Sequence, residues 1–156
     1  MMEVAGYLAL AAAALRLSWV DCRRFVIEYE TLAIMGLAAL WLIWLNGGVT
    51  AVFAAVAVSA AMTFSMACLV CLRWLRKPGA GDWALMFVCV LAGSRNLPVF
   101  AVTLLLAGAV TAVTYAVRRD RPVFRSRFPL APPIAAAAVI GLAVSDIDTG
   151  GIRWLG

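Results

Sequence analysis

The sequence predicts an all-α fold, a polytopic membrane bundle of about six transmembrane helices that forms one domain over residues 1–156. Composition is the first observation behind this prediction. Hydrophobic residues make up 65% of the chain and charged residues 13%, whereas soluble domains average about 45–50% and about 25%. The second observation is a mean hydropathy of +1.00. The third is that most charged residues fall in brief breaks between long apolar runs, so no soluble core could bury the apolar surface.

Six apolar stretches are the expected helices. They cover residues 4–20, 31–45, 49–72, 83–93, 97–117 and 130–145. A helix needs about 20 apolar residues to cross a bilayer, so the fourth stretch is too short to cross alone. We expect it to borrow neighbours such as Gly93 and Ser94, or to begin inside a cavity rather than in lipid. The first stretch follows Glu3 rather than basic residues, and we interpret it as a retained span and not as a signal peptide.

The basic residues predict the orientation. Ten of the thirteen Lys and Arg residues fall in the breaks after the first, third and fifth stretches. The positive-inside rule makes that side cytoplasmic, which leaves both termini outside. The net charge of +5 is thereby explained by membrane orientation rather than by nucleic-acid binding. We expect a multi-pass protein of the inner (cytoplasmic) membrane whose partner is the lipid bilayer, and the oligomeric state is not predicted.

The chain contains no histidine, which excludes Ser-His and Cys-His hydrolases and HExxH metalloproteases. Any chemistry must then use carboxylates, cysteine or lysine. Cys68 and Cys71 form a CxxC pair inside an apolar helix, where thiols usually pack as small hydrophobic groups. No second cysteine pair or histidine is available to complete a zinc site of the usual kind. We therefore expect no metal and no cofactor.

Two acidic residues, Asp21 and Asp82, stand where an apolar stretch meets a cytoplasmic break. The alternating topology places both at the same depth on the same face. Two carboxylates that meet share a proton, so one acts as general base toward a water and the other donates to the carbonyl oxygen. This is the chemistry of an aspartic protease. A structural interpretation stays open, in which Asp21 pairs with Arg23 or Arg24 and Asp82 only caps its helix.

Gly79 and Gly81 surround Ala80 just before Asp82 and permit a sharp, closely packed backbone there. The segment Gly79-Ala80-Gly81-Asp82 resembles the GxGD motif of membrane aspartyl proteases, and in particular of the type IV prepilin peptidases. The segment from Asp21 to Ile27 is similar to that family's first aspartate segment, with Arg two residues and Ile six residues after the Asp. Pro129-Leu130-Ala131-Pro132 is similar to the family's Pro-Phe-Gly-Pro at the mouth of the last span.

The resemblance implies that Asp21 and Asp82 are the catalytic pair and that Gly79 and Gly81 shape the loop that presents Asp82. Three departures from the family pattern are present. Ile27-Glu28-Tyr29 replaces Ile-Pro-Asn, Ala84 replaces a Lys, and Ala131 replaces a Gly. The short connection between the first two stretches resembles the peptidase-only branch that serves Flp or Tad pili, for which N-methylation is not expected.

The expected function is therefore that of an endopeptidase that cleaves the short basic leader from type IV prepilins or pseudopilins at the cytoplasmic membrane face. Glu28 and Glu30 are candidate contacts for the basic leader, although ordinary solvated surface also explains them. The alternative is a catalytically weakened or inactive homologue that acts as an assembly partner in a pilus or secretion system, and the departures favour it. A small transporter is less favoured, because no polar line crosses mid-membrane depth.

Overall fold

The computed structural model describes residues 2–24, 26–72, 79–117 and 131–148, and their regular secondary structure is entirely helical. The elements, in chain order, are α1 (Met2–Arg24), α2 (Tyr29–Cys71), α3 (Ala80–Gly93), the 3-10 helix η1 (Ser94–Asn96), α4 (Leu97–Val117) and α5 (Ala131–Asp148). No strand is found within these residues, so the all-α class is confirmed.

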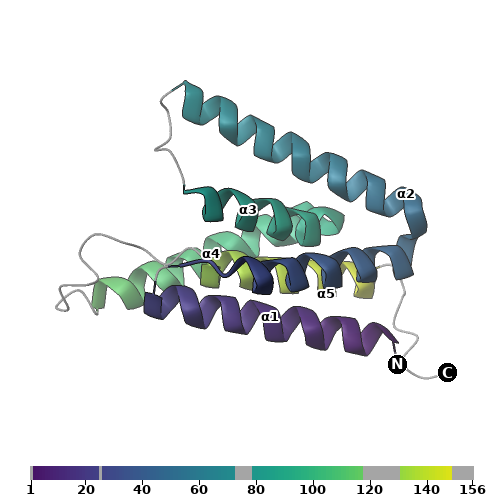
Figure 1. Ribbon diagram of the computed structural model, residues 1–156, viewed down its shortest axis with the longest axis horizontal. Coiled ribbons are helices and arrows are strands. Elements are labelled where there is room, and N and C mark those ends of the chain that lie inside the picture. The colour runs from purple at the N-terminus through teal and green to yellow at the C-terminus, as the bar shows by residue number, and fades with distance from the viewer. Residues whose placement is uncertain (1, 25, 73–78, 118–130, 149–156) are drawn as a thin grey trace.

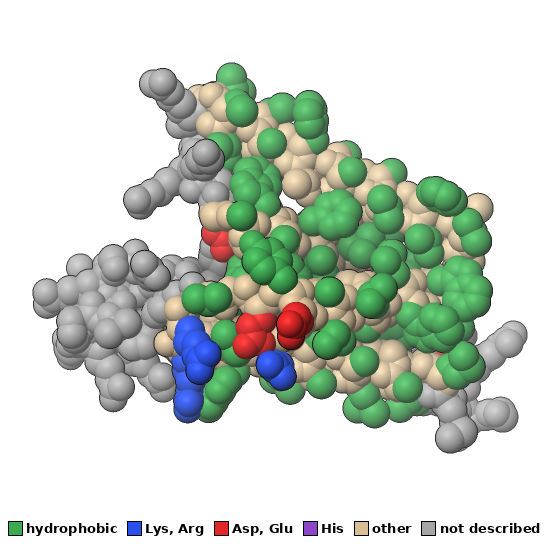
Figure 2. Space-filling model, viewed as in Figure 1, with side chains coloured by type: hydrophobic (Ala, Val, Ile, Leu, Met, Phe, Trp, Pro, Cys, Tyr) green, Lys and Arg blue, Asp and Glu red, His purple; other side chains and the backbone are tan. Residues whose placement is uncertain are grey.

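The helices have the length and composition of membrane spans. Among the described residues, three helical stretches are long and apolar enough to cross a bilayer: Met2–Arg24, Tyr29–Cys71 and Ala80–Thr114. Ala131–Val144 forms a shorter apolar helix. In Figure 2, hydrophobic side chains cover most of the visible face, and the charged side chains gather toward one end. Such a surface suits lipid rather than water, as expected for a membrane protein.

The predicted count of six separate helices is not confirmed, because the second and third expected spans belong to one 43-residue element, α2. The expected polar break at residues 46–48 is a kink and not a loop. Gly48 has φ 64° and ψ −163° inside α2, a conformation open to glycine because it has no Cβ. The chain bends back on itself at this residue (Figure 1). A single glycine thus reverses the direction of the chain, for which the sequence pattern predicted a connecting loop.

The short helix α3 packs between α2 and α5. It has 14 residues, about 21 Å of helix, against the ~30 Å of a bilayer's hydrocarbon core. No residue from Gly81 to Gly93 is exposed, because α2 and α5 pack against this helix. At Gly93 the chain enters η1 directly and continues into α4. The helical stretch that contains the fourth apolar run therefore continues from Ala80 to Thr114 through Gly93 and Ser94, the neighbours that the sequence analysis named.

The segments that resemble the family motifs lie at one end of the bundle, because each lies at a helix end located there. Figure 1 shows the end of α1 and the starts of α3 and α5 at the same end, opposite the Gly48 kink. α1 and α3 each pack on α2 and α5 but make at most marginal contact with each other. The basic residues of 73–77 and 118–127, on which much of the predicted orientation depends, lie outside the described residues.

Candidate active site

Asp21 lies in the last turn of α1 with only 6% of its surface exposed. Its Oδ2 atom accepts a hydrogen bond of 2.8 Å from the backbone N–H of Ala131, the first residue of α5. The first amides of a helix have no partner within the helix, and the helix dipole favours a negative group near them. Pro132 and Pro133 have no N–H to offer. Asp21 therefore caps α5 from another helix and ties two distant parts of the chain together.

The surroundings of Asp21 were only partly predictable. The guanidinium of Arg23, one of its two suggested partners, lies 4.0 Å from the centroid of the Trp19 ring. The amide of Ala131 was missed as a partner, although its segment had been noted for the family resemblance. The signal was the Pro132-Pro133 pair, which leaves Ala131 as the one amide donor among the first three residues of α5.

Asp82 lies in the first turn of α3, and its side chain is half-buried. Its Oδ2 atom accepts a hydrogen bond of 2.9 Å from the backbone N–H of Gly79, the N-cap residue of α3. Asp82 thus caps its helix, as the structural interpretation proposed, but from the third helical position and not as the N-cap residue itself. A carboxylate offers about four lone-pair sites, so one cap bond leaves capacity for a water or a substrate.

Gly81 brings the GxGD segment against the connection that follows α1. A Cβ atom on Gly81 would lie 3.2 Å from Cβ and 3.3 Å from Cδ1 of Ile27. The half-buried Ile27 side chain packs on the hydrophobic core. A residue without a side chain is therefore favoured at position 81. This contact and the bond between Asp21 and Ala131 join three sequence segments that the resemblance had singled out separately.

Glu28 lies between α1 and α2 and is engaged by a residue of α1. Its Oε2 atom accepts hydrogen bonds of 2.9 Å from Arg16 Nε and 2.9 Å from Thr31 Oγ1. These bonds, with that from Arg16 the stronger influence, hold the pKa of Glu28 below its ordinary value. The side chain of Glu30, by contrast, is exposed. Of the two candidate leader contacts, Glu30 is the more accessible to a cationic partner.

Sequence reasoning missed the Arg16–Glu28 ion pair. A signal was available, since an arginine inside an apolar stretch usually has an acid within reach. Arg16 stands five residues before Asp21, and its side chain is 66% exposed. Its long side chain runs along the helix surface toward the polar end, as arginines near helix ends do in membranes.

Cys68 and Cys71 are free, exposed thiols at the end of α2. We expected these thiols to pack as small hydrophobic groups, but both are exposed on α2 and are not buried against the other described residues. Cys89 in α3 is the buried thiol among the described cysteines. Pro129 and Leu130, the first two residues of the Pro129-Leu130-Ala131-Pro132 segment, lie outside the described residues.

No protein-family model, no curated protein and no solved structure matches this chain significantly. The resemblance to a peptidase family therefore depends on the three short motif segments and on their arrangement in the bundle.

Proposed function

We propose that this chain is a membrane-embedded aspartic endopeptidase that removes the short basic leader of type IV prepilins or pseudopilins, with Asp21 and Asp82 as its catalytic pair. One observation supports this proposal above the others. Asp21 is bonded to Ala131, and Ile27 lies against Gly81, so the three segments that resemble the peptidase motifs meet at one end of the bundle.

The proposed reaction uses the two carboxyl groups in opposite protonation states. The ionised carboxylate accepts a proton from a water, and the water oxygen forms a bond to the scissile carbonyl carbon. The protonated partner donates its proton to the carbonyl oxygen, which gives a tetrahedral diol. Proton transfer to the amide nitrogen then breaks the C–N bond and releases the leader carboxylate and the new amino terminus. Neither histidine nor metal is needed.

The two aspartates reach each other, in this proposal, across the helices that separate them. α1 and α3 are held by α2 and α5 and make at most marginal direct contact. We propose that the substrate draws the ends of α1 and α3 together, because catalytic hydrogen bonds often tighten only in the complex with substrate. The bond to Ala131 fixes the Asp21 side chain while Asp82 approaches.

The proposed placement in the membrane has about six crossings, with the two arms of α2 on either side of Gly48 counted separately. The end that carries Asp21 and Asp82 faces the cytoplasm, where the basic breaks of the sequence would lie under the positive-inside rule. The inner membrane is the proposed location.

A second candidate function, an inactive homologue that serves as an assembly partner, has specific support. Asp82 caps its own helix through Gly79, and Asp21 caps α5 through Ala131. A scaffold would keep both carboxylates for these bonds alone. Ala84 and the Glu28-Tyr29 pair also depart from the peptidase pattern, and these departures favour the inactive homologue too.

Processing of a co-expressed prepilin decides between the two functions. We expect the wild-type chain to remove the leader, and Asp21→Asn and Asp82→Asn each to abolish removal while membrane levels stay normal. The double variant should be little worse than either single one, because a dyad works as a unit. Glu30→Gln keeps both aspartates and should at most weaken binding of the basic leader, because exposed charge pairs contribute only about 0–1 kcal/mol. Processing at the wild-type rate by both aspartate variants would replace the peptidase by the scaffold.

A further inference from the structure

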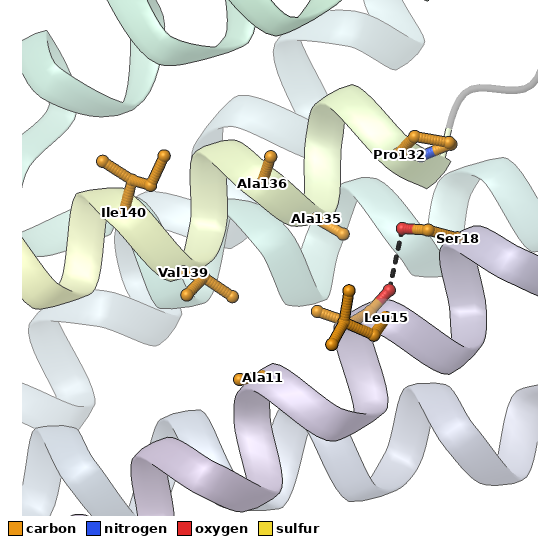
Figure 3. A pocket seen from close by; sticks show the side chains of 9 residues that line it. Ala11, Leu15, Ser18, Pro132, Ala135, Ala136, Val139 and Ile140 are labelled. Carbon is orange, nitrogen blue, oxygen red and sulfur yellow. Dashed lines mark hydrogen bonds between the residues drawn. The ribbon is translucent and has the colours of Figure 1, made fainter.

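A groove of about 370 Å³ lies between α1 and α5 (Figure 3). Its walls are one face of each helix, with residues spaced by three or four positions. They are Ala11, Ala14, Leu15 and Ser18 from α1, and Pro132, Ala135, Ala136, Val139 and Ile140 from α5. From Ala11 to Ser18 the groove follows seven residues of α1, about 10 Å. It is therefore as long as about two turns of a helix laid along it.

Small residues form the floor of the groove and large ones its rim. Ala14 and Ala135 are buried, whereas Leu15 and Ile140 are exposed. Floors of small residues let a further helix backbone come close in a membrane. Ser18 is the one polar side chain of the lining, and its hydroxyl donates to the carbonyl oxygen of Ala14 at 2.8 Å, the dashed line of Figure 3. The groove thus suits an apolar occupant.

The groove ends at the candidate active site. Ser18 stands three residues, about 4.5 Å of helix, before Asp21, and Pro132 follows Ala131 directly. The bond between Asp21 and Ala131 thus lies just beyond the lining residues Ser18 and Pro132, at the polar end of the groove. An occupant that runs along the groove therefore reaches the Asp21 carboxylate with its polar end.

We infer that this groove receives the first turns of the substrate's hydrophobic helix, an inference that rests on the proposed function. A protease needs an extended peptide, because helical carbonyl groups are already hydrogen-bonded along the helix. If the cleavage junction is held extended at Asp21, the substrate's helix begins about one helical turn farther into the membrane. The groove begins at that depth. The leader then continues toward the end that carries the exposed Glu30. A substrate helix explains why the groove ends beside the buried Asp21 carboxylate, whereas a bound lipid chain or a second copy of this protein would not need to lie there.

Two variants narrow the groove from opposite walls, Ala11→Leu in α1 and Ala136→Leu in α5. Both positions are half-buried, so the larger side chain is tolerated by the fold. We expect each to lower processing of full-length prepilin by about tenfold, chiefly through KM, because the added volume displaces a packed helix. A peptide that spans the junction but lacks the hydrophobic helix should be cleaved as by wild type. Ala12→Leu, on an exposed face of α1, is the matched control.

Cross-linking tests the same groove without depending on cleavage. Ile140→Cys should form a disulfide with a cysteine placed one or two turns beyond the junction of the prepilin, and Val113→Cys on exposed α4 should not. Unchanged KM in both groove variants, or a cross-link between two copies of the protein instead, overturns the inference even if the aspartate variants are inactive. If wild type cleaves nothing, the proposed function fails, and the cross-link still reports whether a prepilin helix binds in the groove.

Discussion

The carboxylate of Asp21 and the backbone amide of Ala131 form a 2.8 Å hydrogen bond between α1 and α5. Because this bond is buried, a variant that keeps it but lacks the acid can be compared with one that lacks both, which separates the structural role of Asp21 from its catalytic role. Asn keeps an acceptor oxygen, so the free energy of unfolding of Asp21→Asn should be close to that of wild type. In Asp21→Ala it should fall by about 1–3 kcal/mol, because the Ala131 amide is left without an acceptor. Unfolding of the purified variants in detergent measures this. Both should fail to process prepilin, and equal stability of the two would show that the bond does not stabilise the fold.

Gly81 and Ile27 give a prediction about the GxGD segment. A methyl group at position 81 would press on the Ile27 side chain at 3.2 Å, so Gly81→Ala should cost about 1–3 kcal/mol and slow processing. Ile27→Ala in the same chain should recover part of the loss, which a double-mutant cycle detects. Gly108→Ala is the control, because a Cβ there meets nothing within 4 Å. Additive effects of Gly81→Ala and Ile27→Ala would contradict the contact.

Much of this fold was predictable, because each apolar stretch has to be helical in a membrane. The stretch expected at 97–117 matches α4 residue for residue. The polar residues 46–48 were expected to form a loop, but a positive φ at Gly48 reverses α2 within the helix. Composition marks such a break without telling a kink from a loop.

The sequence predicted at which end of the bundle the candidate site residues lie, but not which groups of neighbouring helices contact them. Alternating topology placed Asp21 and Asp82 at one end, since successive helices run in opposite directions. Which group lies beside each carboxylate depends on how the helices pack side by side. The Pro132-Pro133 pair and the arginine inside an apolar stretch indicate that the Ala131 amide and Arg16 need partners, but only the packing of the helices shows that these partners are Asp21 and Glu28.

The Arg16–Glu28 pair predicts a pH-dependent stability difference. The pKa of Glu28 is lowered from 4.5 by its hydrogen bond from Arg16, so the pair stabilises the fold above that pH. The stabilisation is lost as the pH falls through the lowered pKa and the carboxyl takes up a proton. Arg16→Gln should therefore unfold more easily than wild type at about pH 7, and this difference in stability should shrink as the pH is lowered below 4.5. Detergent unfolding from neutral to acidic pH measures this, with Glu30→Gln as the control. A difference that does not shrink in acid would contradict it.

The ends of the bundle predict which cysteines an impermeant reagent reaches. Cys22 is exposed at the end that carries Asp21, and Asn46 lies beside the Gly48 kink at the other end. With Cys68 and Cys71 replaced by Ala and the buried Cys89 kept, Cys22 should react only in permeabilised cells. Asn46→Cys, in a chain that also lacks Cys22, should react in intact cells. The reverse pattern would place the aspartates outside and rule out a cytoplasmic peptidase.

The kink of α2 gives the sharpest test of the architecture. Gly48 has φ 64° and ψ −163°, a region of backbone space that is essentially restricted to glycine. A Cβ there meets nothing within 4 Å, so any cost of substitution is conformational and not steric. Gly48→Ala should destabilise the protein by about 1–3 kcal/mol.

Gly48→Asn should be no better than Gly48→Ala, because asparagine tolerates the left-handed helical region but not this one. Unfolding midpoints of the two variants and of the control Gly108→Ala, in the same detergent, measure the difference. Because the bend folds the second arm of α2 back toward α3, loss of the bend should also lower the membrane level of the protein. If Gly48→Ala is as stable as Gly108→Ala, the chain does not reverse at Gly48, and the two arms of α2 are one straight helix.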